Sequence, residues 1–255
     1  MPLPDDVREF VPGPARIERD ETTQYWIREG RVIYLGDPGY PVRGADASTF
    51  RFYLGAFGKD QNACYCCHSK LTGGNSSTFR ALNYAYATDG QYVWTLGGKL
   101  KDVDAESFVV CDDGVYHLGE GLRAPHGFGK DRQRVFYYDF DGKPNWVRKA
   151  SPASFLSLND GYFGKDSDFV FCGAATLPKA TVAEWQKIGK FYSKDNSRVY
   201  FLNRQIRDAD IDTFEVIPAT RDWIHLARDK DHFYENDFTI TEADFREQLE
   251  KYGSD

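Results

Sequence analysis

The densest group of reactive side chains in the sequence is the run Cys64-Tyr65-Cys66-Cys67-His68. Thiolates and imidazole are the ligands that zinc prefers, so the run points to a metal or redox site. On a strand, however, Cys66 and Cys67 would point to opposite faces, and one metal ion could reach only some of these groups. Free cysteine also packs as a small buried hydrophobe. We therefore expect structural cysteines, no metal and no cofactor, and keep metal or redox chemistry as the alternative.

Other catalytic patterns are missing from the sequence. The five histidines are spread along the chain without ligand spacing. No nucleophile elbow, phosphate-binding glycine loop or Cys–His signature occurs. We predict that the protein is not an enzyme and has no catalytic residues.

Several polar residues, most of them acidic, lie in segments between the predicted strands. They are solvated loop charge, or they form a negative patch that steers a basic protein partner. On the second interpretation, the candidate partner-binding residues are Asp102, Asp112, Asp113, His117, Glu120, Arg123 and Asp208.

A repeat of about 29 residues must position all of these groups. In each of seven units an apolar residue precedes an aromatic one, and a second aromatic closes the unit. The first aromatics are Tyr34, Tyr65, Trp94, Phe136, Phe171, Tyr200 and Tyr234, and the closing aromatics are Phe50, Phe79, Phe108, Phe155, Trp185, Phe214 and Phe245. We expect these rings to form the core, because a small repeat must bury its apolar face on its neighbours. Exposed stacked rings would instead form a sugar or choline site.

Each unit reads as a strand, a tight turn, a second strand and a short capped helical turn. Apolar and aromatic clusters predict the strands. Cap residues stand four positions before the closing aromatic, as at Asp46 and Thr181. An acid, as in Lys59-Asp60 and Lys194-Asp195, precedes each strand pair. We interpret it as a turn former, with a calcium ligand as the alternative.

These patterns predict a mainly β fold. The units are expected to stack as an open solenoid-like array, with a closed propeller-like ring as the alternative. Residues 1–24 are an irregular proline-rich leader, 25–248 the repeat domain, and 249–255 the end of a capping helix and a tail. The domain has seven full units and a truncated one near residues 109–127, where the period is broken.

The net charge and the cysteine count indicate which partners and which cellular compartment to expect. A net charge of −7 disfavours nucleic acid and anionic membranes as partners. The first residues do not form a signal peptide, and an odd number of cysteines leaves at least one thiol unpaired. We expect a cytoplasmic protein, monomeric when free, with no membrane partner.

The segments Lys194–Tyr200 and Ala209–Phe214 resemble the DKNYY repeat family of bacterial proteins, and the resemblance covers residues 25–248. Some members look like immunity proteins that protect a bacterium from its own secreted toxin, type VI effectors included. The resemblance implies a cytoplasmic immunity protein that neutralises a cognate toxin by occluding it, and it brings no catalytic residues. The alternatives are a module that binds glycans or cell-wall fragments, and a metal-dependent enzyme centred on Cys64, Cys66, Cys67 and His68.

Overall fold

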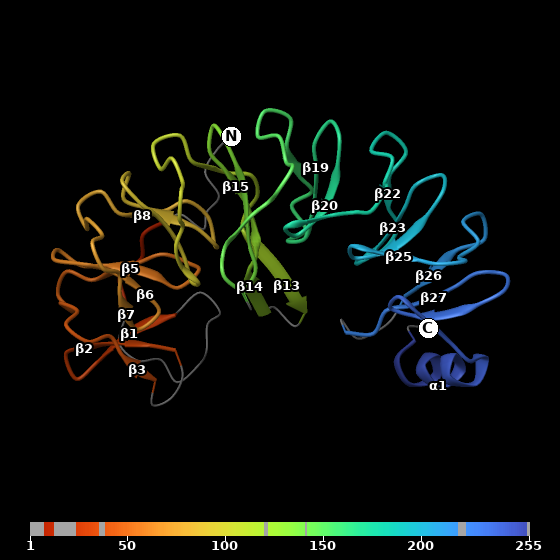
Figure 1. Ribbon diagram of the computed structural model, residues 1–255. Helices are drawn as coiled ribbons and strands as arrows, with labels where there is room; N and C mark the ends of the chain where they lie inside the picture. Colours follow the sequence, from red (N-terminus) through yellow and green to blue (C-terminus); the bar gives the residue numbers. More distant parts are fainter. Residues whose placement is uncertain are drawn as a thin grey trace. The chain divides into compact units, whose positions relative to one another are not determined.

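The computed structural model describes residues 8–12, 24–35, 39–119, 122–140, 142–218 and 223–253. The chain divides into two units, Met1–Tyr162 and Phe163–Asp255. Both units are built from small antiparallel sheets, and the described part of the chain contains one helix, α1 (Glu242–Tyr252) (Figure 1). The predicted mainly β class is confirmed.

The sheets of the first unit follow one another along the chain. The first sheet is β1-β2-β3, with strands Tyr25–Arg28, Arg31–Tyr34 and Tyr40–Pro41. The second is β4-β5-β6-β7, with strands Arg51–Phe52, Phe57–Lys59, Cys64–Cys66 and Ser69–Lys70. The third is β8 to β11, with strands Arg80–Ala81, Ala87–Thr88, Val93–Thr95 and Gly98–Lys99.

The fourth sheet of this unit carries an insertion. Its order is β12-β15-β16-β17, with strands Val109–Val110, Gly127–Lys130, Val135–Tyr138 and Asn145–Trp146. Between β12 and β15 the chain forms a separate two-stranded hairpin, β13 (Val115–Gly119) and β14 (Leu122–Pro125). The last strand of the unit is β18 (Leu156–Ser157).

The second unit repeats the same architecture. Its strands are β19 (Phe163–Lys165), β20 (Val170–Cys172), β21 (Ala175–Thr176), β22 (Gln186–Lys187), β23 (Tyr192–Lys194), β24 (Val199–Phe201), β25 (Arg204–Ile206), β26 (Glu215–Ile217), β27 (Leu226–Arg228), β28 (Phe233–Glu235) and β29 (Phe238–Ile240). The strands β22 to β25 form one antiparallel sheet and β26 to β29 another. Helix α1 follows β29, and the Thr241 hydroxyl accepts a hydrogen bond from the Asp244 amide at its first turn.

The predicted two-stranded hairpin is half of the observed module. The pairs β6–β7 and β24–β25 are the expected hairpins, but each lies in a sheet of four strands. The first two strands of each such sheet were missed. The first strand, such as β4 or β22, is only two residues long and shows no alternation of apolar and polar residues. The prediction of a truncated repeat unit near residues 109–127 is also corrected. It is a hairpin inserted within a sheet, because β12 pairs with β15 around it.

Strand register explains why a small residue precedes each acid. In the second strand of each four-stranded sheet the small residue lies directly opposite the aromatic, as in Gly58 opposite Tyr65 and Ser193 opposite Tyr200. The closing aromatic then covers the small residue. A Cβ added at Gly58 would lie 2.6 Å from the Phe50 ring. A larger residue would therefore displace the ring that completes the core.

The fourteen predicted core rings are all buried. They form chains of ring contacts that run from one sheet to the next. Phe50, for example, packs between Tyr25 and Tyr65, with ring centroids 5.1 and 5.6 Å away. Phe245 of α1 packs on Phe233 with ring centroids 4.8 Å apart.

The acid that opens the strand pair is a buried turn residue in six of the seven repeat units, whereas Glu29 of the first repeat unit is exposed. Six of these residues, called here the turn aspartates, are buried: Asp60, Asp89, Asp131, Asp166, Asp195 and Asp229. At Asp60, Oδ1 accepts the amides of Asn62 (2.7 Å) and Ala63 (2.8 Å). Its Oδ2 accepts the Tyr65 hydroxyl (2.9 Å) and the amide of Asp46 (2.8 Å), the cap residue of the preceding turn. The predicted turn role is confirmed.

The bond from cap to turn aspartate recurs along the chain. Oδ2 of a turn aspartate accepts the backbone amide of a cap residue at distances of 2.8 to 3.0 Å, and the donors are Asp46, Asn75, Asp104, Thr181 and Asp210. The carboxylate therefore joins each sheet to the capped turn that precedes it. Burying a carboxylate is costly unless its oxygens are hydrogen-bonded, and these bonds meet that requirement.

Of the predicted leader, residues 8–12 and 24 lie within the described part of the chain. Phe10 forms an isolated antiparallel bridge with Phe52, in which its amide donates to the Phe52 carbonyl over 2.8 Å. The rest of the leader lies outside the described residues.

Candidate functional site

The hairpin β13–β14 is the clearest departure from the repeated sheets. Its register pairs Tyr116 with Ala124 and His117 with Arg123, and an irregularity follows before Gly119 pairs with Leu122. Tyr116 and Ala124, toward the base, are buried. Toward the tip the side chains of His117, Leu118, Leu122 and Arg123 are exposed.

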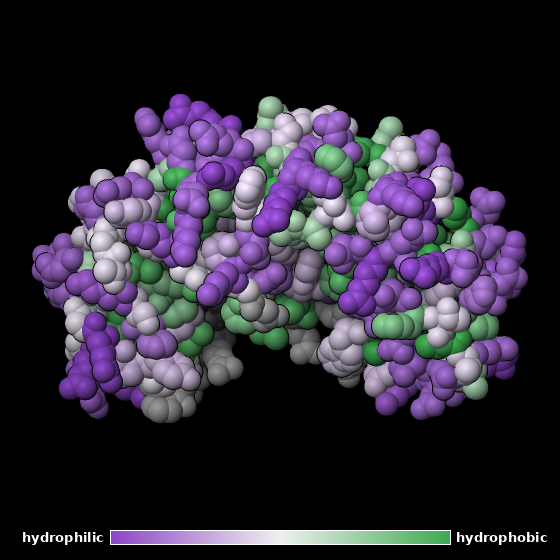
Figure 2. Space-filling model, viewed as in Figure 1, coloured by the Kyte–Doolittle hydropathy of each residue, from purple (hydrophilic) through white to green (hydrophobic). Residues whose placement is uncertain are grey.

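Two leucines are exposed where the hairpin ends. Leu118 is 48% and Leu122 is 59% exposed. Apolar (green) side chains gather at the lower edge of Figure 2, where Figure 1 shows the ends of β13 and β14. These leucines were not among the predicted site residues. The sequence did contain a signal for them. Gly119-Glu120-Gly121 is typical of a turn, and residues that flank a turn are usually polar, so a leucine on each side is unusual.

Asp112 anchors the base of the hairpin. Its Oδ1 accepts the Gly114 amide (3.1 Å), and its Oδ2 accepts the Phe128 amide (2.9 Å) and the Ser157 hydroxyl (2.7 Å). Burial of this carboxyl raises its pKa to about 7, although the three hydrogen bonds oppose the shift and Asp113 adds to it. The side chain is therefore committed to the fold and not available to a partner.

Asp113 is also used within the fold. Its Oδ1 accepts the Val115 amide (3.0 Å), its amide donates to Asn159 Oδ1 (2.9 Å), and its Oδ2 accepts the Asn159 side-chain amide (3.4 Å). The Tyr116 ring packs on Tyr162, with ring centroids 4.8 Å apart. Hydrogen bonds and ring contacts thus hold the base of the hairpin rigidly to the surrounding sheet.

The other predicted partner-binding residues are only partly brought together. His117 and Arg123 are exposed and face each other across the hairpin. Asp102 is exposed in the loop after β11, with φ of +54°, and its carbonyl accepts a hydrogen bond from Arg134. Asp208 belongs to the other unit. Glu120 lies outside the described residues. The predicted patch therefore reduces to the hairpin.

The cysteine-rich run lies on β6 and in the turn that follows it. Cys64 and Cys66 are buried, Cys67 is half-buried, and His68 stacks on Tyr40 with ring centroids 5.2 Å apart. No disulfide joins any of the five cysteines, all of which lie in the described part of the chain. Within the described ranges, no group of three or more His, Cys, Asp or Glu side chains is arranged to hold a metal ion.

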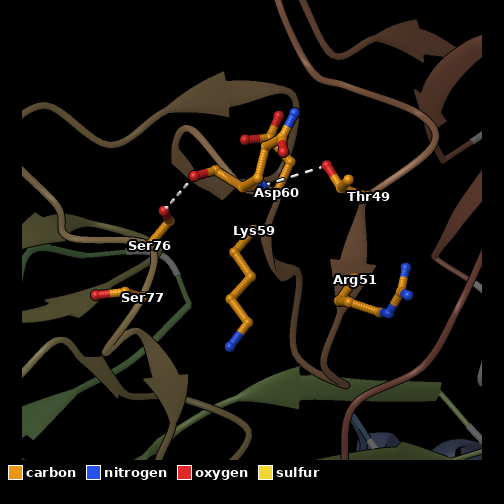
Figure 3. Close-up of a pocket in the computed structure, with 7 residues that line it drawn as sticks. Thr49, Arg51, Lys59, Asp60, Ser76 and Ser77 are labelled. Carbon is orange, nitrogen blue, oxygen red and sulfur yellow. Dashed lines mark hydrogen bonds between the residues drawn. The ribbon is translucent and has the colours of Figure 1, made fainter.

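A shallow recess lies between two capped turns (Figure 3). It has a volume of about 350 Å³ and is lined by Thr49, Arg51, Lys59, Asp60, Gln61, Ser76 and Ser77. Its polar groups largely bind the protein itself. Lys59 Nζ donates to the Phe79 carbonyl (3.0 Å) and pairs with Glu9 (2.6 Å), and the Ser76 hydroxyl donates to the Gln61 carbonyl (3.1 Å). The recess therefore offers few groups to a ligand.

Comparison with known proteins places the repeated sheets in a family. The model of the DKNYY family matches residues 57–238. The chain belongs to the DKNYY family. The DKNYY match begins at the first residue of β5, ends at the first residue of β29 and includes all six turn aspartates. No curated protein and no solved structure matches the chain.

One finding bears on membranes. In the part of the chain that the structure describes, no helix combines the length and the apolar character needed to cross a bilayer.

Proposed function

We propose that this DKNYY protein is a cytoplasmic immunity protein that binds a cognate secreted bacterial toxin, such as a type VI effector, and neutralises it by occlusion. In this proposal the repeated sheets form an open solenoid-like scaffold, and the hairpin β13–β14 presents the binding surface. The observation that carries the proposal is the exposed pair Leu118 and Leu122 on a hairpin that interrupts the repeat.

The tip and the base of the hairpin have complementary properties. Exposed leucines at a tip are apolar anchors, which contribute to binding when a partner buries them in a pocket. The base is fixed by the bonds of Asp112 and Asp113, so little conformational freedom remains to be lost on binding. Insertions in repeat scaffolds also tend to fall on the binding face.

Charge supports a basic partner. The net charge of −7 produces a field that attracts a positively charged protein and accelerates its encounter. The fourteen repeat rings are buried in the core, so they are not available to stack against a sugar. A protein partner therefore fits the described surface better than a glycan does.

The test begins with the product of the adjacent reading frame. We expect it to be toxic when expressed alone, and expect this protein to rescue the cells and to bind the toxin as one monomer. The double variant L118D/L122D should weaken binding at least tenfold, which corresponds to about 1.4 kcal/mol. The matched control L156D alters a leucine that is 64% exposed on β18 and should leave the affinity within about twofold.

Two outcomes would contradict the proposal. Unchanged binding by L118D/L122D would show that the hairpin is not the binding surface. Absence of a toxic neighbour, together with failure to rescue any intoxicated cell, would remove the immunity function itself.

A further inference from the structure

Residues 8–12, called here the strap, pair with the edge of the second sheet. The Phe10 amide donates to the Phe52 carbonyl over 2.8 Å, and the Phe52 amide donates to the Phe10 carbonyl over 3.0 Å. The two residues form an antiparallel bridge on the side of β4 that faces away from β5. Strand addition of this kind is a common way for a sheet edge to bind an extended peptide. The sheet therefore already holds one such segment, which comes from its own chain.

The side chain of Glu9 is held by a cation and a hydroxyl. Its Oε1 lies 2.6 Å from Lys59 Nζ and accepts a hydrogen bond from the Tyr53 hydroxyl over 2.7 Å. Tyr53 is only 1% exposed. Burial alone would raise the pKa of Glu9, but these hydrogen bonds and the Lys59 charge hold the pKa below its ordinary value. This part of the site therefore recognises a carboxylate.

The side chain of Phe10 meets an apolar surface. Successive residues of a strand point to opposite sides, so this ring and the Glu9 carboxylate reach different groups. The ring stacks on Phe52 with ring centroids 5.5 Å apart. It also packs against a buried cluster, which consists of Leu54, Tyr84 and Val115. This part of the site therefore recognises an aromatic residue directly after the carboxylate.

The strap can leave without stranding a buried donor. The Phe79 carbonyl also accepts hydrogen bonds from the Tyr53 hydroxyl (3.0 Å) and from Lys59 Nζ (3.0 Å), so both donors keep a partner when Glu9 departs. Three of the five strap side chains are exposed. Few contacts therefore have to break for the strap to detach.

We propose that this edge of the second sheet is a binding site for extended peptides in which a carboxylate residue precedes an aromatic one, and that the strap is its resident ligand. A partner protein's segment of that chemistry pairs with Phe52, places its carboxylate on Lys59 and Tyr53, and displaces the strap. This inference is independent of the proposed toxin binding, which concerns the exposed tip of the hairpin.

Exchange of one occupant for another is favoured over an empty site. Loss of the strap alone uncovers Leu54, Tyr84 and Val115, whereas a partner peptide covers them again. The strap is tethered, so it competes at an effective concentration of about 1 mM. A free peptide should therefore bind far better when the strap has been weakened.

The first test uses the full-length protein and a fluorescent synthetic peptide of residues 6–14, DVREFVPGP. In Glu9→Lys/Phe10→Ala the strap loses both of its anchors, so we expect the peptide to bind this variant at least tenfold more tightly than the wild type, measured by fluorescence anisotropy. The matched control is the peptide that itself carries Glu9→Lys and Phe10→Ala, which should bind at least tenfold more weakly. Lys59→Met, added to the same variant, should weaken binding of the native peptide about tenfold.

Hydrogen exchange of the wild type keeps the test decisive if the variants fold poorly. Detachment of the strap is a local opening, so the Phe52 amide should exchange at a rate that low concentrations of urea do not change. The Tyr53 amide, which donates to the Phe57 carbonyl over 2.9 Å, should exchange faster as urea is added. Equal affinities of the native and control peptides, no binding to a folded variant, or exchange of Phe52 only together with Tyr53 would overturn the proposal.

Discussion

Removal of a turn aspartate should destabilise the sheet that it joins to the preceding turn. Asp229 is buried, and its carboxylate accepts four hydrogen bonds: from the amides of Asp231 (2.8 Å), His232 (2.7 Å) and Asp210 (2.9 Å), and from the Tyr234 hydroxyl (2.7 Å). In Asp229→Ala these donors lose their acceptor.

The magnitude follows from which donors can reach water. The bonds from the Asp231 and His232 amides are part-buried, as is that from the Asp210 amide, so solvent can replace these three only in part. The Tyr234 hydroxyl is buried. A buried donor without a partner costs about 1–3 kcal/mol, so we expect Asp229→Ala to lower the free energy of unfolding by about 3 kcal/mol. Asp229→Asn should cost less, because its remaining oxygen can still accept the turn amides.

Urea unfolding followed by far-UV circular dichroism measures this loss. Asp231→Ala is the matched control, since Asp231 is exposed in the same turn and its backbone bond to Asp229 does not depend on its side chain. It should change the free energy of unfolding by no more than about 0.5 kcal/mol. Equal effects of the two substitutions would refute the assigned role of the carboxylate.

The effect should also depend on pH. Burial alone would raise the pKa of Asp229, but hydrogen bonds from Tyr234 and from three backbone amides outweigh it and hold the pKa below its ordinary value. A carboxyl whose pKa is lower in the folded state stabilises the fold above the unfolded-state pKa, near 4, and loses that contribution as the pH falls through the folded-state value. The difference between the wild type and Asp229→Ala should therefore shrink when unfolding is measured at about pH 2–3 in place of pH 7.

Three further predictions concern other parts of the fold. A Cβ added at Gly129 would lie 2.3 Å from the Phe108 ring, so Gly129→Ala should lower the free energy of unfolding by about 2 kcal/mol in urea, and an unchanged midpoint would contradict the ring placement. The pKa of Asp112 is raised by burial to about 7, so the folded state binds a proton between about pH 4 and 7 and stability should fall as the pH rises through that window. Asp112→Asn should flatten that slope, and an unaltered slope would contradict the assignment. Thr241→Ala removes the cap bond to the Asp244 amide (3.1 Å) and should cost about 1 kcal/mol, measured by thermal unfolding, unless α1 is not capped there.

The core residues of the repeated sheet could be predicted from the sequence, but its short strands could not. Aromatic residues such as Tyr200 and Phe214 could be placed in the core because the repeat supplies several copies of one environment. The first strand of a sheet could not be found, since a two-residue strand such as β22 has no periodicity. Its pairing depends on the neighbouring strand and not on its own side chains.

The candidate site was predictable in position and not in detail. The break in the period located the hairpin, but an acidic residue in a loop looks the same in sequence whether it faces solvent or the protein. Asp112 and Asp113 are hydrogen-bonded to the protein. Their partners Phe128, Ser157 and Asn159 come from other strands and loops. Such long-range partners leave no signal in the local sequence.

The most direct test of the repeated architecture is native-state hydrogen exchange at the cap amides. Each of these amides, at Asp46, Asn75, Asp104, Thr181 and Asp210, donates to a buried turn aspartate. We predict that all five exchange far more slowly than the amide of Ser48, whose bond to Asp46 Oδ1 (3.0 Å) is exposed to solvent, and that Asp229→Ala abolishes protection at Asp210 alone. Exchange of the five amides at the rate of Ser48 would contradict the account.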